Sequence, residues 1–116
     1  MMFFLRQLRK RCIWSWAGLV LCWREEHSFR SWVWANVVSA ALAIALPLSA
    51  AETAVLVMGG VIVLALECLN TALERIVDDI STDQRDAARQ AKDAGSAVVA
   101  VSAVAVGIAW IVILLG

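Results

Sequence analysis

The stretch of sequence that decides the fold is "VLALECLNTALERIVDD", Val63 to Asp79. It begins as an apolar run suited to a lipid bilayer, yet it also carries Glu67, Asn70, Glu74 and Asp78. At about 100° per residue, the last three fall at roughly −60°, −20° and +20° relative to Glu67 on a helix surface. The pattern therefore predicts a long helix with one polar, mostly acidic face.

The composition is typical of a helical membrane protein. Of the 116 residues, 62 % are apolar and one is proline, and the mean hydropathy is +0.80. A soluble domain of this size could not bury so much apolar surface. The ten basic and ten acidic residues cancel, so the net charge does not favour nucleic acid as a partner.

The order of polar and apolar segments predicts one all-α membrane domain over residues 1–116. Residues 3–24 mix basic side chains with tryptophans, which is typical of an amphipathic helix at headgroup depth. Because about 20 residues at ~1.5 Å each cross the hydrocarbon layer, we expect three transmembrane helices, over 32–51, 53–80 and 96–115. We expect Pro47 to end the first of them, "SAAE" to form a tight turn, and "DAARQAKD" to add at most a helical turn to a polar connection.

The positions of lysine and arginine predict the orientation in the membrane. Six of the ten precede the first predicted span and four lie at or after the end of the second, whereas the other two ends have none. By the positive-inside rule, the N-terminus and residues 75–93 share the cytoplasmic side and the C-terminus faces out. The acidic face of the second span then ends at the cytoplasmic surface.

The acidic face admits several interpretations. A carboxylate inside the edge of a bilayer is costly unless it faces protein, pairs with a charge or binds a cation. The acids could satisfy contacts between helices in a non-catalytic scaffold, or couple ions in a small oligomeric transporter. Alternatively, Glu26 and Glu74 could bind Mg²⁺, which takes one or two carboxylates plus substrate phosphates, while Glu67 acts as a general base.

A second polar cluster, "AKDAGSA" at residues 91–97, lies on the same predicted side. Lys92 could contact phosphate, and Gly95 and Ser96 are small enough for a helix or lipid to approach closely. The alternative is that Lys92 and Asp93 are ordinary headgroup-region charges. No P-loop or dinucleotide-binding glycine motif occurs, which excludes those two kinds of phosphate site.

These segments resemble the prokaryotic diacylglycerol kinase and undecaprenol kinase family. "LECLNTALERIVDDI" is similar to the family signature E-x-L-N-[ST]-A-[IL]-E-x-x-V-D, and "AKDAGSAVV" to its A-K-D-x-[GA]-[SA]-A block. "EHSFR", residues 26–30, resembles the E-x-x-F-R element ahead of the first span. The resemblance covers residues 13–116, with the blocks in the right order and spacing.

The resemblance implies an ATP-dependent diacylglycerol kinase that works with Mg²⁺ in the bacterial inner membrane. It implies a homotrimer with active sites at the cytoplasmic interface between subunits. The product would be phosphatidic acid, and undecaprenol is the alternative acceptor lipid. "KDAGSA" is closer to the diacylglycerol kinases, whereas "EHSFR" is closer to the E-x-N-F-R element of the undecaprenol kinases.

The resemblance also implies roles for individual residues. Glu67 resembles the catalytic base, and Glu26 and Glu74 resemble the carboxylates that hold magnesium on ATP. The implied nucleotide-binding positions are Trp14, Glu26, Asn70, Glu74, Asp78, Asp83, Gln84, Arg85, Lys92 and Asp93. The implied lipid-binding positions are Trp23, Phe29, Arg30, Glu67, Ser96 and Trp110.

Overall fold

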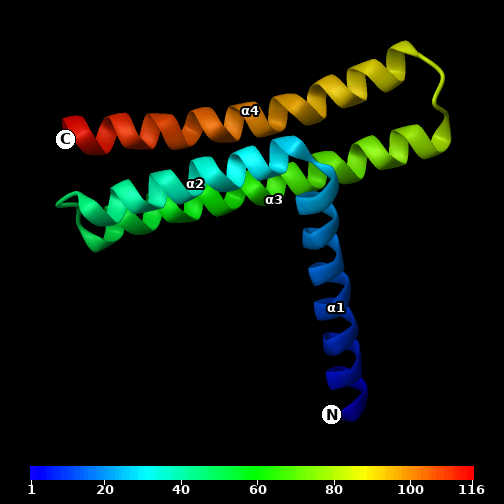
Figure 1. The fold of residues 1–116 in the computed structure, drawn as a ribbon, viewed down its shortest axis with the longest axis horizontal. Coiled ribbons are helices and arrows are strands. Elements are labelled where there is room, and N and C mark those ends of the chain that lie inside the picture. Colours follow the sequence, from blue (N-terminus) through cyan, green and yellow to red (C-terminus); the bar gives the residue numbers. More distant parts are fainter.

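The computed structural model describes residues 1–116, and every element in it is an α-helix (Figure 1). The chain order is α1 (Met2–Glu25), α2 (His27–Ala45), α3 (Ala50–Ile80) and α4 (Asp86–Leu115). α3 packs against both α2 and α4 to form a three-helix bundle, and the chain turns sharply at Glu26 between α1 and α2. The prediction of an all-α fold is confirmed.

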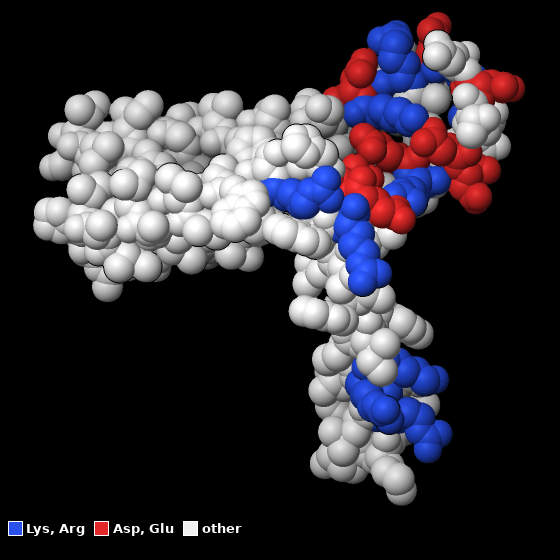
Figure 2. All heavy atoms as spheres, in the orientation of Figure 1, with Lys and Arg blue, Asp and Glu red and all other residues white.

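α1 extends sideways from the bundle (Figure 1). The molecule measures 49 and 47 Å along its two longer directions and 22 Å along the third, because α1 and the bundle run in different directions. Only Cys22 of α1 is buried. In Figure 2, the basic side chains of α1 lie on its side toward the charged end of the bundle, and uncharged side chains lie on the opposite side. Such a two-sided helix suits a membrane interface.

α3 and α4 are long and apolar enough to cross a membrane. Their most apolar stretches have mean hydropathies of 2.0 and 2.9, and only 22 % and 6 % of these stretches are buried within the chain. A core helix of a soluble protein would be mostly buried, so these surfaces need lipid or another subunit against them. α2 is shorter, at 19 residues, and is not among the helices that meet this test.

The turn between α2 and α3 comes earlier in the chain than predicted. α2 ends at Ala45, well before residue 51, and Leu46 is extended with ψ of 154°, as the residue before a proline favours. Ser49 then caps α3: its hydroxyl accepts from the backbone N–H of Glu52 at 3.1 Å, and the Glu52 carboxylate accepts from the Ser49 N–H at 2.8 Å. "SAAE" is therefore a capping box that starts α3 rather than the connecting turn.

α4 also begins earlier than predicted, at Asp86 rather than at residue 96. The segment "DAARQAKD" forms the first turns of one continuous helix, since alanine, arginine, glutamine and lysine all favour helix and an acid suits the first turn. The connection between α3 and α4 is consequently short, residues 81–85. Lys92 and Asp93 thus project from a helix rather than from a loop.

Side-chain hydrogen bonds join the apolar parts of the helices. The side-chain amide of Asn36 in α2 donates to the carbonyl oxygen of Gly60 in α3 at 2.9 Å. The indole N–H of Trp110 in α4 donates to the hydroxyl of Ser39 in α2, also at 2.9 Å. Because few competing partners exist in an apolar environment, such bonds fix how the helices align.

Candidate active site at the charged end of the bundle

The charged side chains of the bundle, apart from Glu52 at the start of α3, gather at one end (Figure 2). At this end α2 begins, α3 ends and α4 begins. The rest of the bundle surface visible in Figure 2 carries no charge. A site for a charged ligand is therefore confined to this end.

Glu67 is the buried carboxylate where the apolar part of α3 meets the charged end. Its exposed fraction is 3 %, and the hydroxyl of Ser28, in the first turn of α2, donates to its Oε1 at 2.5 Å. The other oxygen, Oε2, has no hydrogen-bond partner in the chain and is not fully enclosed. Glu67 therefore has one occupied oxygen and one that can still accept a proton or hydrogen bond.

Asn70 and Glu74 lie on the following turns of α3. The Asn70 amide donates to Glu74 Oε1 at 3.5 Å, whereas Asn70 Oδ1 is buried without a partner. Asn70 Oδ1 lies against Gly95 of α4, where a Cβ atom would collide with it. A glycine at this position is what allows α4 to approach the polar face of α3.

Arg75 joins the corner between α1 and α2 to α3. Its guanidinium binds the carboxylate of Glu25 and lies 3.7 Å from a carboxylate oxygen of Glu26. At the same corner, Arg30 donates to the carbonyl oxygens of Trp23 at 2.7 Å and Arg24 at 3.1 Å. These bonds satisfy carbonyl groups at the end of α1 and hold α1 where it leaves the bundle.

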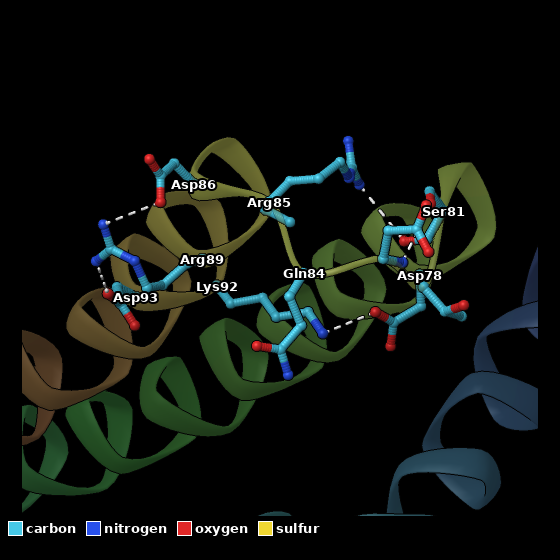
Figure 3. Close-up of a pocket in the computed structure, with 11 residues that line it drawn as sticks. Asp78, Ser81, Gln84, Arg85, Asp86, Arg89, Lys92 and Asp93 are labelled. Carbon is cyan, nitrogen blue, oxygen red and sulfur yellow. Dashed lines mark hydrogen bonds and ion pairs between the residues drawn. The ribbon is translucent and has the colours of Figure 1, made fainter.

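An open polar cavity of about 540 Å³ lies between the end of α3 and the start of α4 (Figure 3). Lys92 reaches across it to Asp78, with 2.7 Å between Nζ and Oδ1. Arg89 lies between Asp86 and Asp93, at 4.0 and 3.4 Å from their carboxylates. Six of the residues implied to bind nucleotide line this cavity: Asp78, Asp83, Gln84, Arg85, Lys92 and Asp93.

The chain is similar in sequence to known proteins. Residues 13–114 match the prokaryotic diacylglycerol kinase family. The chain belongs to this family. It is 36 % identical over 102 residues to a diacylglycerol kinase of Pseudomonas aeruginosa, covering 88 % of this chain and 83 % of the relative.

Two further curated relatives carry the same name. The chain is 32 % identical over 100 residues to the diacylglycerol kinase of Escherichia coli K12, covering 86 % of this chain and 82 % of the relative. It is 34 % identical over 93 residues to that of Haemophilus influenzae, with coverages of 80 % and 79 %. Membership in this family makes the chain a phosphotransferase of a membrane-protein family. The prediction that the chain is a lipid kinase is therefore confirmed.

The oxygen atoms of this kinase suit a magnesium ion that arrives with a nucleotide. No group of three or more acidic, histidine or cysteine side chains could hold a metal ion without other ligands. Magnesium, however, needs only one or two carboxylates when phosphates and water complete its shell. Glu74 forms no ion pair, and Asn70 one turn before it has an unpartnered buried oxygen. The Glu26 carboxylate lies 3.7 Å from Arg75, so it would interact with both Arg75 and a bound metal.

The residues implied to bind lipid do not form one site within a single chain. Phe29 is buried, Ser96 is exposed on α4, and the indole of Trp110 is bonded to Ser39. Trp23 and Arg30 lie together at the corner between α1 and α2. Trp14, implied to bind nucleotide, is 65 % exposed on α1 and does not line the polar cavity.

Ser28 and Arg75 are contacts of the site that the sequence reasoning missed. The bond from Ser28 to Glu67 joins residues 39 positions apart, and no spacing rule signals such a contact. Arg75 does have a signal in the sequence, because it is the one basic residue within the acidic run "LERIVDD". A lone cation among acids on one helix is expected to pair with an acid on the same or a neighbouring element.

Proposed function

We propose that this kinase transfers the γ-phosphate of ATP to the hydroxyl of diacylglycerol, giving phosphatidic acid, with Glu67 as the general base. The observation that carries the proposal is the position of Glu67: a buried carboxylate with one unbonded oxygen, where the apolar part of α3 meets the charged end of the bundle. A lipid hydroxyl reaches this boundary from the apolar side. A nucleotide reaches it from the charged side.

The chemistry requires mainly positioning and charge stabilisation. The acceptor oxygen attacks the γ-phosphorus in line with the bridging oxygen, the bond to that oxygen breaks, and ADP leaves while the hydroxyl proton passes to Glu67 Oε2. Lys92, released from Asp78, contacts the phosphates. Magnesium held by Glu74 and Glu26 would neutralise phosphate charge when it is bound with ATP.

Nucleotide binding in this proposal uses two adjoining regions. The first is the polar cavity between α3 and α4, with its three basic residues Arg85, Arg89 and Lys92. The second is the Asn70 and Glu74 pair, one to two turns along α3 from Asp78 toward Glu67. A nucleotide that lies along this face can hold its phosphates near Glu67, because Asn70, Glu74 and Asp78 share one side of α3 with Glu67.

The proposed arrangement in the membrane has three spans, α2 to α4, with α1 on the inner surface of the bacterial inner membrane. α2 runs along α3, and its 19 residues cover about 28 Å at ~1.5 Å each, close to the hydrocarbon thickness. The N-terminus and the site are cytoplasmic, and the C-terminus is outside.

A homotrimer is part of the proposal, and two observations support an oligomer. The apolar surfaces of α3 and α4 are mostly exposed in one chain. In addition, Trp23 and Ser96, which are implied to bind lipid, are exposed and do not form one enclosed site. Neighbouring subunits would cover the apolar surfaces and complete the site.

The competing functions receive less support. A transporter needs charged groups along the whole membrane path, whereas the charged residues of α2 to α4, apart from Glu52, lie toward the end of the bundle where α3 ends and α4 begins. A scaffold needs neither an unbonded oxygen on Glu67 nor a polar cavity between the end of α3 and the start of α4. Undecaprenol remains the alternative acceptor, because the site as described contacts only a hydroxyl and apolar chains.

The test is phosphorylation of diacylglycerol and undecaprenol, each presented to purified protein with magnesium ATP. Glu67→Gln keeps the shape of the side chain but removes the base, so we expect turnover to fall by about 10²- to 10⁴-fold while the folded oligomer persists. Glu52→Gln is the matched control, since glutamine also completes a capping box. Full turnover by Glu67→Gln would refute the assignment of the base, and faster turnover of undecaprenol would refute the acceptor.

A further inference from the structure

The hydrogen bond from Ser28 to Glu67 is the only one that the Glu67 carboxylate makes within the chain. Ser28 lies in the first turn of α2, two residues after Glu26, and its hydroxyl donates at 2.5 Å. The hydroxyl hydrogen is donated to Oε1, so this oxygen is engaged while Oε2 is not.

Ser28 lies at the start of α2. The first turn of α2 has no side-chain cap, and the backbone N–H groups of His27, Ser28 and Phe29 lack partners within the helix. This end of the helix dipole is positive and stabilises a nearby negative charge. Ser28 therefore links Glu67 to the end of α2 that suits a carboxylate.

The same bond limits how the carboxylate can turn. The last torsion of a glutamate side chain is broad, so an unbonded carboxylate samples many orientations. With Oε1 fixed by Ser28, Oε2 is the oxygen left for an acceptor hydroxyl. A reacting group that is fixed in this way loses less entropy at the moment of reaction.

We propose that Ser28 is a positioning residue for the phosphoryl transfer: its hydroxyl holds Oε1 of Glu67 and directs Oε2 to the hydroxyl of the lipid acceptor. This inference rests on the proposed role of Glu67 as the base. Ser28 touches neither ATP nor the acceptor in this proposal. It acts only through Glu67, so its removal should lower kcat and leave the KM for ATP unchanged.

The test compares Ser28→Ala, Ser28→Cys and Ser28→Thr in the full-length protein with magnesium ATP and diacylglycerol. We expect kcat to fall by about 10- to 100-fold in Ser28→Ala, less in Ser28→Cys, whose thiol is a weak donor, and little in Ser28→Thr. The KM for ATP should change by less than about twofold. Ser31→Ala is the matched control, because Ser31 lies one turn later in α2 and donates to the His27 carbonyl oxygen instead.

Unfolding of each variant is measured in parallel, and kcat is expressed per folded enzyme. Unchanged kcat in Ser28→Ala, equal losses in the alanine and threonine variants, or a rise in kcat would each overturn the proposal. Labelled phosphate attached to Ser28 would also overturn it, since the hydroxyl would then be an acceptor. If Glu67→Gln is fully active, the proposed function fails; if it is inactive while Ser28→Ala is normal, only the role of Ser28 fails.

Discussion

Lys92 and Asp78 form an ion pair that joins the start of α4 to the end of α3, with 2.7 Å between Nζ and Oδ1 (Figure 3). The side chains are 40 % and 51 % exposed, so water screens the attraction. Exposed pairs of this kind contribute about 0 to 1 kcal/mol. The pair can therefore open at little cost, and Lys92 can exchange a carboxylate for a phosphate.

Replacing Lys92 by methionine should weaken ATP binding much more than it weakens the fold. A hydrogen bond to a charged phosphate contributes about 1.5 to 3 kcal/mol, and about 1.4 kcal/mol corresponds to a tenfold change. We therefore expect the KM for ATP to rise at least tenfold in Lys92→Met, measured at saturating lipid. Lys10→Met, in the outer part of α1, is the control. An equal KM in Lys92→Met and the unaltered enzyme would exclude the phosphate contact.

Replacing Glu74 by glutamine should change the response to magnesium. The amide keeps the size of the side chain but lacks the charge, so the metal loses one hard anionic ligand. We expect the magnesium concentration for half-maximal activity to rise about tenfold, measured by titration at a fixed ATP concentration. Asp79→Asn is the control, because Asp79 is an exposed acid on the same helix. An unchanged magnesium response would mean that Glu74 is not a ligand.

The sequence was sufficient for the fold class, and it singled out six of the residues that line the polar cavity. Apolar runs predicted the helices, and helical spacing predicted that Glu67, Asn70, Glu74 and Asp78 share one side of α3. In the structure Glu67 contacts α2, and Asn70 and Asp78 contact α4. Segments near each other in the chain, such as the end of α3 and the start of α4, were also easy to place together. Periodicity and chain proximity are local properties, which a single sequence records.

Helix ends and long-range contacts were harder to predict. The capping box of Ser49 and Glu52 is a local signal in the sequence that marks the start of α3. Without it, the predicted turn was placed too late in the chain, after Pro47. The bond from Ser28 to Glu67 is different, because it depends on how α2 packs against α3. The distribution of the implied lipid-binding residues over all four helices likewise depends on tertiary, and in our proposal quaternary, packing.

Glycine to alanine changes at positions 60 and 107 should have opposite effects on stability. A Cβ at Gly60 would lie 3.0 Å from Cγ of Asn36 and would also collide with its Oδ1, disturbing the bond from Asn36 to the Gly60 carbonyl oxygen. We expect Gly60→Ala to lower the free energy of unfolding by about 1 to 3 kcal/mol. At Gly107 a Cβ meets nothing within 4 Å.

Gly107→Ala is the matched control for this pair and should raise the free energy of unfolding by up to about 1 kcal/mol, since alanine favours helix. Both values can be measured by denaturant unfolding in mixed micelles. Equal effects at the two positions would contradict the close approach of α2 and α3. Loss of the oligomer in Gly107→Ala alone would show that this surface of α4 contacts another subunit.

The bond between Trp110 and Ser39 should appear as a coupling energy in a double-mutant cycle. The indole donates to the hydroxyl at 2.9 Å, joining α4 to α2. Hydrogen bonds between helices in membranes average about 0.6 kcal/mol and reach about 1.7, so we expect the coupling between Ser39→Ala and Trp110→Phe to fall within this range. The measurement is the free energy of unfolding of the two single variants and the double variant.

Trp34→Phe provides the control for the loss of an indole, because Trp34 lies in α2 with 63 % of its surface exposed and no hydrogen bond to another residue. It should show no coupling to Ser39→Ala. The cycle also decides what Trp110 does in the enzyme. Strong coupling together with an unchanged KM for lipid would make Trp110 a structural link between α2 and α4. No coupling, together with a raised KM for lipid in Trp110→Phe, would instead indicate that the indole binds the acceptor, as the family resemblance implies.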